Sequence, residues 1–348
     1  MKIYKDFHNL SFLRHILQKF HFGFKFYCAY PQIQAQLYCA KQKNLSVTPA
    51  ACRLPLSRGG IGSPSGPCVF MTAQQTEGFY LLRFIMSEFI SLYSGSAGNS
   101  SVVRCGERYL IVDMGKGVRT TGAALKELEL NISDCDGILV THEHSDHVKG
   151  LSTFLKKYPL PVYGAEETLE FLDANGVVPA SCDLTALTPG REEDIGVFGV
   201  KAFPTSHDVP CVGYRIHTPD EKTMTIATDL GVLTPAVHEA LSGCDLVALE
   251  SNYDLHMLRS GPYPYYLRAR IESVRGHLSN DECAAKLLEL IQEGCKKFAL
   301  CHLSQENNTP MLALQTVFST LGTAGVVPDK DCIVQTQRRN EVSPALAF

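Results

Sequence analysis

Three imidazoles and two carboxylates stand close together in residues 141–147, which read THEHSDH. Neutral imidazole and carboxylate are the ligands that Zn²⁺ accepts in catalytic sites. The chain holds 12 histidines in all, so three of them with an aspartate inside six residues make an improbable accident. The simpler interpretation is a polar loop or a solvated helix start, with Ser145 or Asp146 as an N-cap.

The elements on either side of this run must position it. The apolar residues 137–140 predict a buried strand, and residues 148–155 have the apolar spacing of a helix. Side chains alternate along an extended backbone, so His142 and His144 point to one side. Asp146 and His147 then lie on the turn and face a second point nearby. This arrangement suits two metal ions that share one pocket.

Other polar residues lie at or just beyond the ends of predicted strands. They are Asp113 after 109–112, His207 between 196–202 and 212–216, Asp229 after 224–228, Glu250 at the end of 245–250 and His302 after 297–301. Taken alone, an acid at a strand end is often a turn former, and a lone histidine is usually a surface residue. The small-residue loop 94–100 predicts either a hairpin turn or a backbone that lies close to the site.

Residues 262–280 interleave tyrosines with arginines and end in GHLSN. Aromatics with arginines such as Arg268, Arg270 and Arg275 can stack bases and hold phosphates. The alternative is a surface helix whose Tyr and Arg stems cover apolar area. His277 is in that case a polar residue in front of a helix at 280–292, with Ser279 or Asn280 as its cap.

The HxHxDH pattern of residues 142–147 resembles the metallo-β-lactamase superfamily, and all five of that family's motifs follow in order within residues 86–340. The resemblance implies an α+β fold, the αββα sandwich, in which two mixed β-sheets lie between layers of helices. It also implies two divalent metal ions, with Zn²⁺ expected and Mn²⁺ as the alternative. By analogy, one ion is held by His142, His144 and His207, the other by Asp146, His147 and His302, with Asp229 as the bridge and Asp113 orienting a ligand from behind.

Two residues receive catalytic roles from the same resemblance. Asp146 is expected to act as a proton acceptor as well as a ligand. His277 is expected to contact the phosphate or to donate a proton to the leaving oxygen. Glu250 and Asn252 lie near the positions where the family places pocket residues.

The family resemblance identifies the substrate less directly than it identifies the metal ligands, because one fold serves many reactions. A bridging Asp229 points away from the β-lactamase branches, and the 73 positions between Asp229 and His302 leave no room for the domain inserted in β-CASP nucleases. The combination of SGSxGNS, THEHSDH, GHLSN and HLS looks most like the YycJ/WalJ branch. That likeness implies a 5′-to-3′ exonuclease acting on DNA with a hydroxide activated by two metals.

Two other functions remain open. Glyoxalase-like thioesterases and lactonases share the bridging aspartate, so a hydrolase of a small ester, thioester or lactone is the alternative. A non-catalytic zinc-binding regulatory protein is a third possibility, although all seven expected ligands are intact.

Composition frames these expectations. The 348 residues are 45% hydrophobic and 20% charged, as in a globular protein of one large or two small domains. Residues 1–85 hold ten basic and two acidic side chains, whereas the remainder holds 22 and 34. We predict a disordered or artefactual extension over 1–85, with Met86 as the true start, a hydrolase domain over 86–340 and a tail over 341–348. A transit peptide or a small folded module are the alternatives for the extension.

The 13 cysteines are scattered without CxxC spacing, which favours free thiols in a reducing compartment. No run of 18 apolar residues occurs, so no membrane span is predicted. We therefore expect a cytoplasmic enzyme with nucleic acid, DNA above all, as its partner. The sequence predicts no oligomeric state.

Overall fold

The computed structural model describes residues 24–27, 36–39 and 86–348. In the first part, β1 (Phe24–Tyr27) pairs antiparallel with β2 (Gln36–Cys39). The predictions for residues 1–85 otherwise fall outside the described residues. Residues 86–348 belong to the second of two compact units of the chain.

The first sheet of this unit has seven strands in the order β16-β3-β4-β5-β6-β7-β8. Strands β5 to β8 run parallel, whereas β16, β3 and β4 are antiparallel to their neighbours. The strands are β3 (Ser87–Tyr93), β4 (Ser100–Cys105), β5 (Arg108–Val112), β6 (Cys135–Val140), β7 (Val162–Gly164), β8 (Leu184–Ala186) and β16 (Leu346–Ala347). Every residue of β6 is buried, as expected of a strand covered on both faces.

The second sheet has the order β15-β14-β13-β12-β11-β10-β9 and is likewise mixed. Its parallel part is β12 to β15, and its antiparallel part is β9 to β12. The strands are β9 (Glu192–Ile195), β10 (Phe198–Pro204), β11 (Val212–His217), β12 (Thr223–Ala227), β13 (Leu246–Glu250), β14 (Lys297–Cys301) and β15 (Ile333–Thr336).

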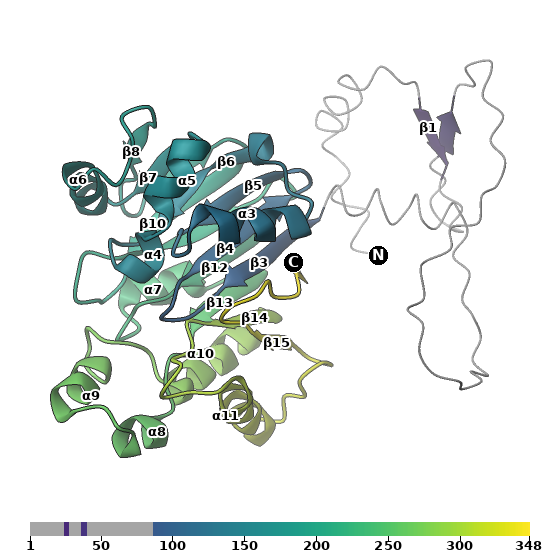
Figure 1. Ribbon diagram of the computed structural model, residues 1–348. Coiled ribbons are helices and arrows are strands. Elements are labelled where there is room, and N and C mark those ends of the chain that lie inside the picture. The colour runs from purple at the N-terminus through teal and green to yellow at the C-terminus, as the bar shows by residue number, and fades with distance from the viewer. Residues whose placement is uncertain (1–23, 28–35, 40–85) are drawn as a thin grey trace, which may run out of the picture. The chain divides into compact units, whose positions relative to one another are not determined.

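Helices cover the outer face of each sheet (Figure 1). The first sheet carries α3 (Val118–Glu127), α4 (Ser145–Val148), α5 (Leu151–Lys157) and α6 (Glu166–Ala174), and the second carries α7 (Pro235–Leu241), α10 (Asn280–Gln292) and α11 (Pro310–Thr323). Helix α10 shows why, because Cys283, Leu287 and Leu290 recur at helical spacing and are all buried against the sheet. The expected αββα sandwich is thereby confirmed.

A separate apolar core fills the space between the two sheets. Phe89 and Val103 of the first sheet pack in it with Tyr214 and Met224 of the second, and all four are at most 1% exposed. Two short helices, α8 (Leu255–Ser260) and α9 (Tyr265–Ile271), stand outside the layers at the lower left of Figure 1.

The last residues of the chain differ from the expected tail. Residues 341–348 end in β16, where Leu346 pairs with Phe89. Leu346 and Phe348 are each 6% exposed and join the core between the sheets. Burial of these two apolar side chains explains why the C-terminal segment adds a strand to the first sheet.

The helix expected at 148–155 is two helices. Helix α4 begins three residues earlier, at Ser145, and α5 begins at Leu151. Gly150 lies between them with its backbone against the Lys116 carbonyl, so closely that an added Cβ would lie 1.8 Å from that oxygen. This close approach separates the two helices and holds α4 against the first sheet.

Candidate metal centre

The candidate site lies where the carboxyl ends of parallel strands from both sheets meet. Asp113 follows β5, Asp229 lies two residues beyond β12, and His302 follows β14. All three have left-handed backbone conformations, with φ of 62°, 57° and 54°. Such conformations are unfavourable for residues with a Cβ and gather at functional sites. The surrounding fold therefore fixes these side chains at some cost in backbone energy.

Asp113 fixes the start of the histidine run from behind. Its carboxylate accepts hydrogen bonds from the Thr141 amide at 2.9 Å and from the Thr141 hydroxyl at 2.9 and 3.1 Å. It also accepts from His147 Nδ1 at 2.7 Å. Because Nδ1 must then carry the proton, His147 Nε2 is left to face the site.

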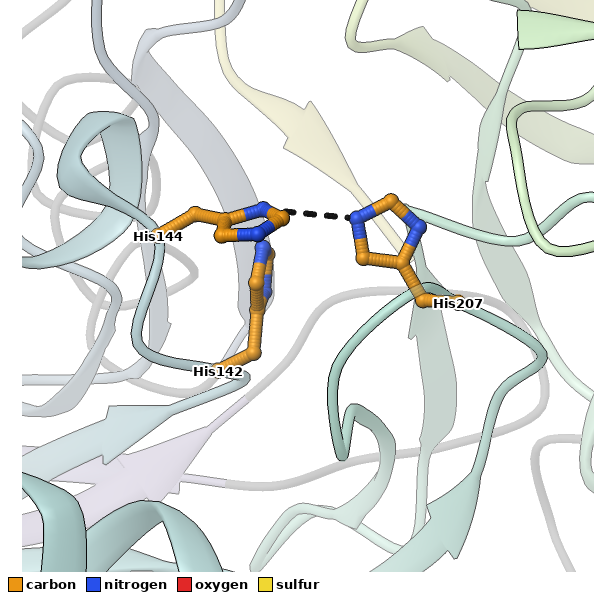
Figure 2. Close-up of side chains that lie close together, drawn as sticks. All are labelled: His142, His144 and His207. Carbon is orange, nitrogen blue, oxygen red and sulfur yellow. Dashed lines mark hydrogen bonds between the residues drawn. The ribbon is translucent and has the colours of Figure 1, made fainter. Parts of the chain in front are cut away.

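The first group of candidate ligands is His142, His144 and His207, whose ligand atoms lie within 4.8 Å of one another. Figure 2 shows the three rings converging, with His144 Nδ1 and His207 Nε2 3.4 Å apart. His207 Nδ1 is directed away, toward the Gly276 carbonyl at 3.2 Å. The structure thus brings His207 to the two histidines of the run across 63 residues of sequence.

The second group is Asp146, His147 and His302, which also lie within 4.8 Å of one another. Asp146 Oδ2 is 3.5 Å from His147 Nε2 and 3.6 Å from His302 Nε2. Asn99, in the small-residue loop, donates to Asp146 Oδ2 at 3.2 Å. The sequence left open whether this loop is a hairpin turn or lies close to the site, and it did not single out Asn99.

Asp229 lies between the two groups and is 2% exposed. Its Oδ2 is 3.3 Å from His147 Nε2, and its Oδ1 is 3.4 Å from His302 Nδ1 and 4.0 Å from His207 Nε2. It forms one candidate cluster with His142 and His147 and another with Glu250, His277 and His302. A carboxylate in this position can offer one oxygen to each of two cations.

Glu250, the last residue of β13, is fully buried, and the sequence suggested no more for it than a place near the pocket. Its Oε1 accepts from His302 Nδ1 at 2.7 Å and from His277 Nδ1 at 2.9 Å. Its Oε2 accepts from the amides of Leu230 and Leu278, each at 3.1 Å. Glu250 thus orients two site histidines, as Asp113 orients His147, and both carboxylates end buried strands.

Burial and neighbouring charges shift the pKa values of the histidines in this pocket. Burial lowers the pKa of His142 well below its usual value, helped by the nearby His147, so its imidazole is neutral. Burial acts the same way on His147, but Asp229 and Asp113 outweigh it and raise its pKa to about 10. A cation bound at His147 Nε2 must therefore displace a proton.

The carboxylates respond in the opposite sense. Burial would raise the pKa of Glu250, but His277 and His302 lower it to about 2. Burial would also raise the pKa of Asp229, which His302 and His147 hold well below its usual range. Both groups are therefore anionic and offer charge to a cation.

Three buried atoms of the candidate ligands have no hydrogen-bond partner: His142 Nε2, His302 Nε2 and Asp229 Oδ2. Leaving buried polar atoms unpaired costs free energy, so such atoms call for an explanation. Bound divalent metal would satisfy all three, and a set of imidazoles with carboxylates suits Zn²⁺ or Mn²⁺. The residues present therefore fit the metal centre that the fold implies.

The arginines of the 262–280 segment are engaged within the protein. Arg275 donates to the carbonyls of His207 at 2.9 Å and Asp208 at 3.0 Å. Arg270 pairs with the Asp208 carboxylate, and Arg268 donates to the Arg259 carbonyl. Arg275 thus braces the loop that carries His207, a role that the sequence did not suggest.

Comparison with known proteins identifies the class of this fold and site. A family model of the beta-lactamase superfamily domain matches residues 108–302. The chain belongs to the metallo-β-lactamase superfamily. Within it, the chain falls in the YycJ/WalJ-like branch, as the motifs predicted.

Two relatives carry that placement. The exodeoxyribonuclease YycJ of Bacillus anthracis is 37% identical over 239 residues, which are 68% of this chain and 90% of YycJ. The exodeoxyribonuclease WalJ of Streptococcus pneumoniae serotype 2 is 33% identical over 236 residues, 67% of this chain and 87% of WalJ. The metallo-beta-lactamase fold protein YhfI of Bacillus subtilis superposes with a TM-score of 0.58 at 16% identity over 76% of this chain and all of YhfI, which supports the fold alone.

Among the described residues, no helix has the length and apolar character needed to cross a membrane.

Proposed function

We propose that this protein is a metal-dependent phosphodiesterase that degrades DNA as a 5′-to-3′ exonuclease. The observation that carries the proposal is the meeting of two ligand groups at the buried Asp229, with unpartnered nitrogen and oxygen atoms turned inward. The first group is His142, His144 and His207, and the second is Asp146, His147 and His302. Paired centres of this kind suit in-line displacement at phosphorus.

The grouping of the side chains supports the assignment of metal ligands that the family resemblance implies. His142, His144 and His207 would hold one ion, Asp146, His147 and His302 the other, and Asp229 would contact both. When bound, such ions polarise the phosphoryl group, lower the pKa of a water molecule and neutralise charge on the attacking and leaving oxygens.

His277 is the proposed proton donor. Its Nδ1 donates to Glu250 at 2.9 Å, and its side chain is 22% exposed, so Nε2 is available to a substrate. Burial would lower the pKa of His277, but Glu250 and Asp229 raise it, which keeps a proton on the ring. From this position His277 hands that proton to the oxygen that leaves the phosphate.

Asp146 is the proposed proton acceptor on the attacking side. Its side chain is 23% exposed, whereas that of Asp229 is 3% exposed, so Asp146 is the more accessible of the two. Burial would raise its pKa, but the neighbouring imidazoles of His147 and His302 lower it, which keeps the carboxylate ionised. The side-chain amide of Asn99 donates to Asp146 Oδ2 at 3.2 Å and holds this oxygen in place.

DNA as the substrate is supported by the relatives that carry the name exodeoxyribonuclease and align over most of their length. A cytoplasmic location is part of the same proposal. Buried free thiols such as Cys211, Cys283 and Cys301 support a reducing compartment.

The test uses the full-length protein with zinc or manganese and four 5′-labelled substrates, single- and double-stranded DNA and RNA. A 5′-to-3′ exonuclease releases the label at once as a mononucleotide, whereas cleavage from the 3′ end leaves a ladder of labelled products. Asp146→Ala, tested in parallel, should abolish the release.

We expect labelled mononucleotide from DNA and none from the variant. Release from RNA alone would reassign the sugar preference. No cleavage of any of the four substrates with either metal would refute the proposal and favour the hydrolase of a small ester, thioester or lactone.

A further inference from the structure

Two aromatic side chains on α9 are far more exposed than an apolar ring normally is. Tyr265 is 79% exposed and Tyr266 is 74% exposed. Neither ring supports the core, because both lie outside the three clusters of buried apolar residues. Tyrosine in such a position is typical of a contact surface, where the ring offers area at little entropic cost.

The segment that carries these rings is basic on an otherwise acidic protein. Residues 255–276 hold four arginines and one glutamate, although residues 86–348 as a whole hold 22 basic and 34 acidic side chains. Arg259 and Arg270 remain 62% and 58% exposed while they make their ion pairs. A local basic patch with exposed aromatic rings is the composition that tracks a single-stranded nucleic acid.

This segment is fixed directly to the candidate metal centre. Arg270 pairs with Asp208, whose Oδ1 lies 3.2 Å from His207 Nε2. The Ser206 hydroxyl donates to the Val274 carbonyl at 2.7 Å. The end of α9 and the loop after it therefore pack on the loop that carries a candidate metal ligand.

Helical geometry separates the two tyrosines. Residues four apart share a helix face, so Tyr266 lies on the same face as Arg270, about 6 Å from it along the axis. Tyr265 lies instead over Arg268, three residues on, and Arg268 donates to the Arg259 carbonyl in α8. Around the helix axis, Tyr266 therefore lies nearer to Arg270, which reaches the metal centre, whereas Tyr265 is rotated about 100° from Tyr266 and lies nearer to Arg268.

We infer that Tyr266 is a stacking platform for an unpaired base of the substrate, next to the phosphodiester held at the metal centre. This inference rests on the proposed function and assigns it a preference for a single-stranded end. Every nucleobase offers a π-face, so the contact tolerates any sequence. A base inside a duplex is already stacked on its neighbours and cannot use the ring.

The experiment measures binding to the metal-loaded protein of a short single-stranded DNA with a phosphorothioate backbone, which resists cleavage. Tyr266→Ala should raise the Kd roughly 5- to 150-fold, the range found for removal of one base–aromatic stack. Tyr266→Phe should keep the wild-type Kd, because the ring remains. Tyr265→Ala is the matched control, because Tyr265 is similarly exposed but is rotated away from Arg270, and its Kd should stay within about twofold of wild type.

A duplex of the same sequence gives the second arm, and its Kd should be the same for wild type and Tyr266→Ala. The metal content and Tm of each variant, measured in parallel, should match wild type because both rings are exposed. Equal Kd values for wild type and Tyr266→Ala on the single strand would overturn the inference. Equal losses in the Tyr265→Ala and Tyr266→Ala proteins would overturn the assignment to one face of α9.

The two proposals can fail separately. Binding to the phosphorothioate strand does not depend on cleavage. A protein that binds it through Tyr266 but cleaves none of the four labelled substrates keeps the platform and loses the nuclease assignment. A protein that cleaves DNA, but whose binding to the single strand is unchanged by Tyr266→Ala, keeps the nuclease assignment and loses the platform.

Discussion

His277 is the residue whose role separates a proton donor from a ligand. His277→Ala should lower nuclease activity by about 10²- to 10⁴-fold, the usual contribution of a general acid, and should leave the metal content unchanged. His277 Nδ1 already has a partner without any metal, because it donates a hydrogen bond to Glu250 at 2.9 Å. Activity and metal per chain should be measured on the same preparation.

The control for this variant is His217→Ala, a histidine that pairs with Glu192 at the far end of β11. It should keep both activity and metal. Loss of metal from His277→Ala would make His277 a ligand and would contradict the assignment.

The Glu250 carboxylate accepts hydrogen bonds from two histidines and two backbone amides. Glu250→Gln keeps the side-chain shape but places an NH₂ group among these donors. The variant should bind zinc about 10- to 100-fold more weakly, as expected for loss of a partner that orients a ligand. It should also lose about 1–3 kcal/mol of stability for each buried donor left unpaired.

Zinc competition and thermal unfolding measure these two effects. Glu239→Gln is the matched control, because Glu239 is 77% exposed in its pair with Lys201. Unchanged zinc affinity in Glu250→Gln would refute the orienting role.

The sequence predicted the ligand candidates better than the groups behind them. His142, His144 and His147 were visible because three imidazoles so close together seldom occur outside a metal site. Glu250 gave no such signal, since an acid that ends an apolar strand is usually a turn former. Only the fold brings its carboxylate to His277 and His302, 27 and 52 residues away.

At the scale of elements, the loops on the first sheet interlock through backbone contacts. The backbone amide of Asn99 donates to the backbone carbonyl of Asp146 at 2.7 Å, and the backbone amide of Gly115 donates to the backbone carbonyl of Asn99 at 2.9 Å. A Cβ on Gly115 would lie 1.9 Å from the Asp146 carbonyl oxygen and 2.5 Å from the Asn99 amide nitrogen. Only glycine allows α4 and these loops to approach so closely.

Gly115→Ala should therefore displace Asp146, lower stability by about 1–3 kcal/mol or more, and weaken metal binding. Denaturant unfolding with and without zinc measures both effects. Gly122→Ala, inside α3 with no neighbour within 4 Å of the added Cβ, is the control and should stabilise the protein by about 0.5–1 kcal/mol. A Gly115→Ala protein as stable as wild type would contradict the close packing.

Periodicity predicted most strands and helices, including α10, for which the sequence offered Ser279 or Asn280 as the cap. In the fold Ser279 is the N-cap and forms a capping box with Glu282. It did not predict the break between α4 and α5, which depends on contact of Gly150 with a distant carbonyl. It also left open whether Arg275 binds substrate. In the fold its guanidinium is committed to the His207 and Asp208 carbonyls.

At the scale of the whole molecule, the candidate centre joins the two sheets. Asp146 and His147 lie in α4, which follows β6 of the first sheet, and Asp229 and His302 follow strands of the second. Ions held by both groups would link the layers. Chelation should therefore lower the Tm, by about 5–10 °C if the ions are present at about 100 times their Kd.

Differential scanning calorimetry with and without a chelator measures this shift, and an unchanged Tm would contradict such a link. The substrate is the property that the fold predicts least, since one architecture hosts many reactions. Motifs narrowed it to one branch of the superfamily, and the two candidate ligand groups are the basis of the phosphodiester proposal.

The most direct measurement is a metal titration of the nuclease activity. The protein is stripped with a chelator, then zinc or manganese is added in equivalents per chain while release of 5′-labelled mononucleotide from DNA is followed. Two ligand groups meeting at Asp229 predict no activity in the stripped protein and full activity at about two equivalents. Undiminished activity after stripping, or full activity at about one equivalent, would contradict a paired metal centre.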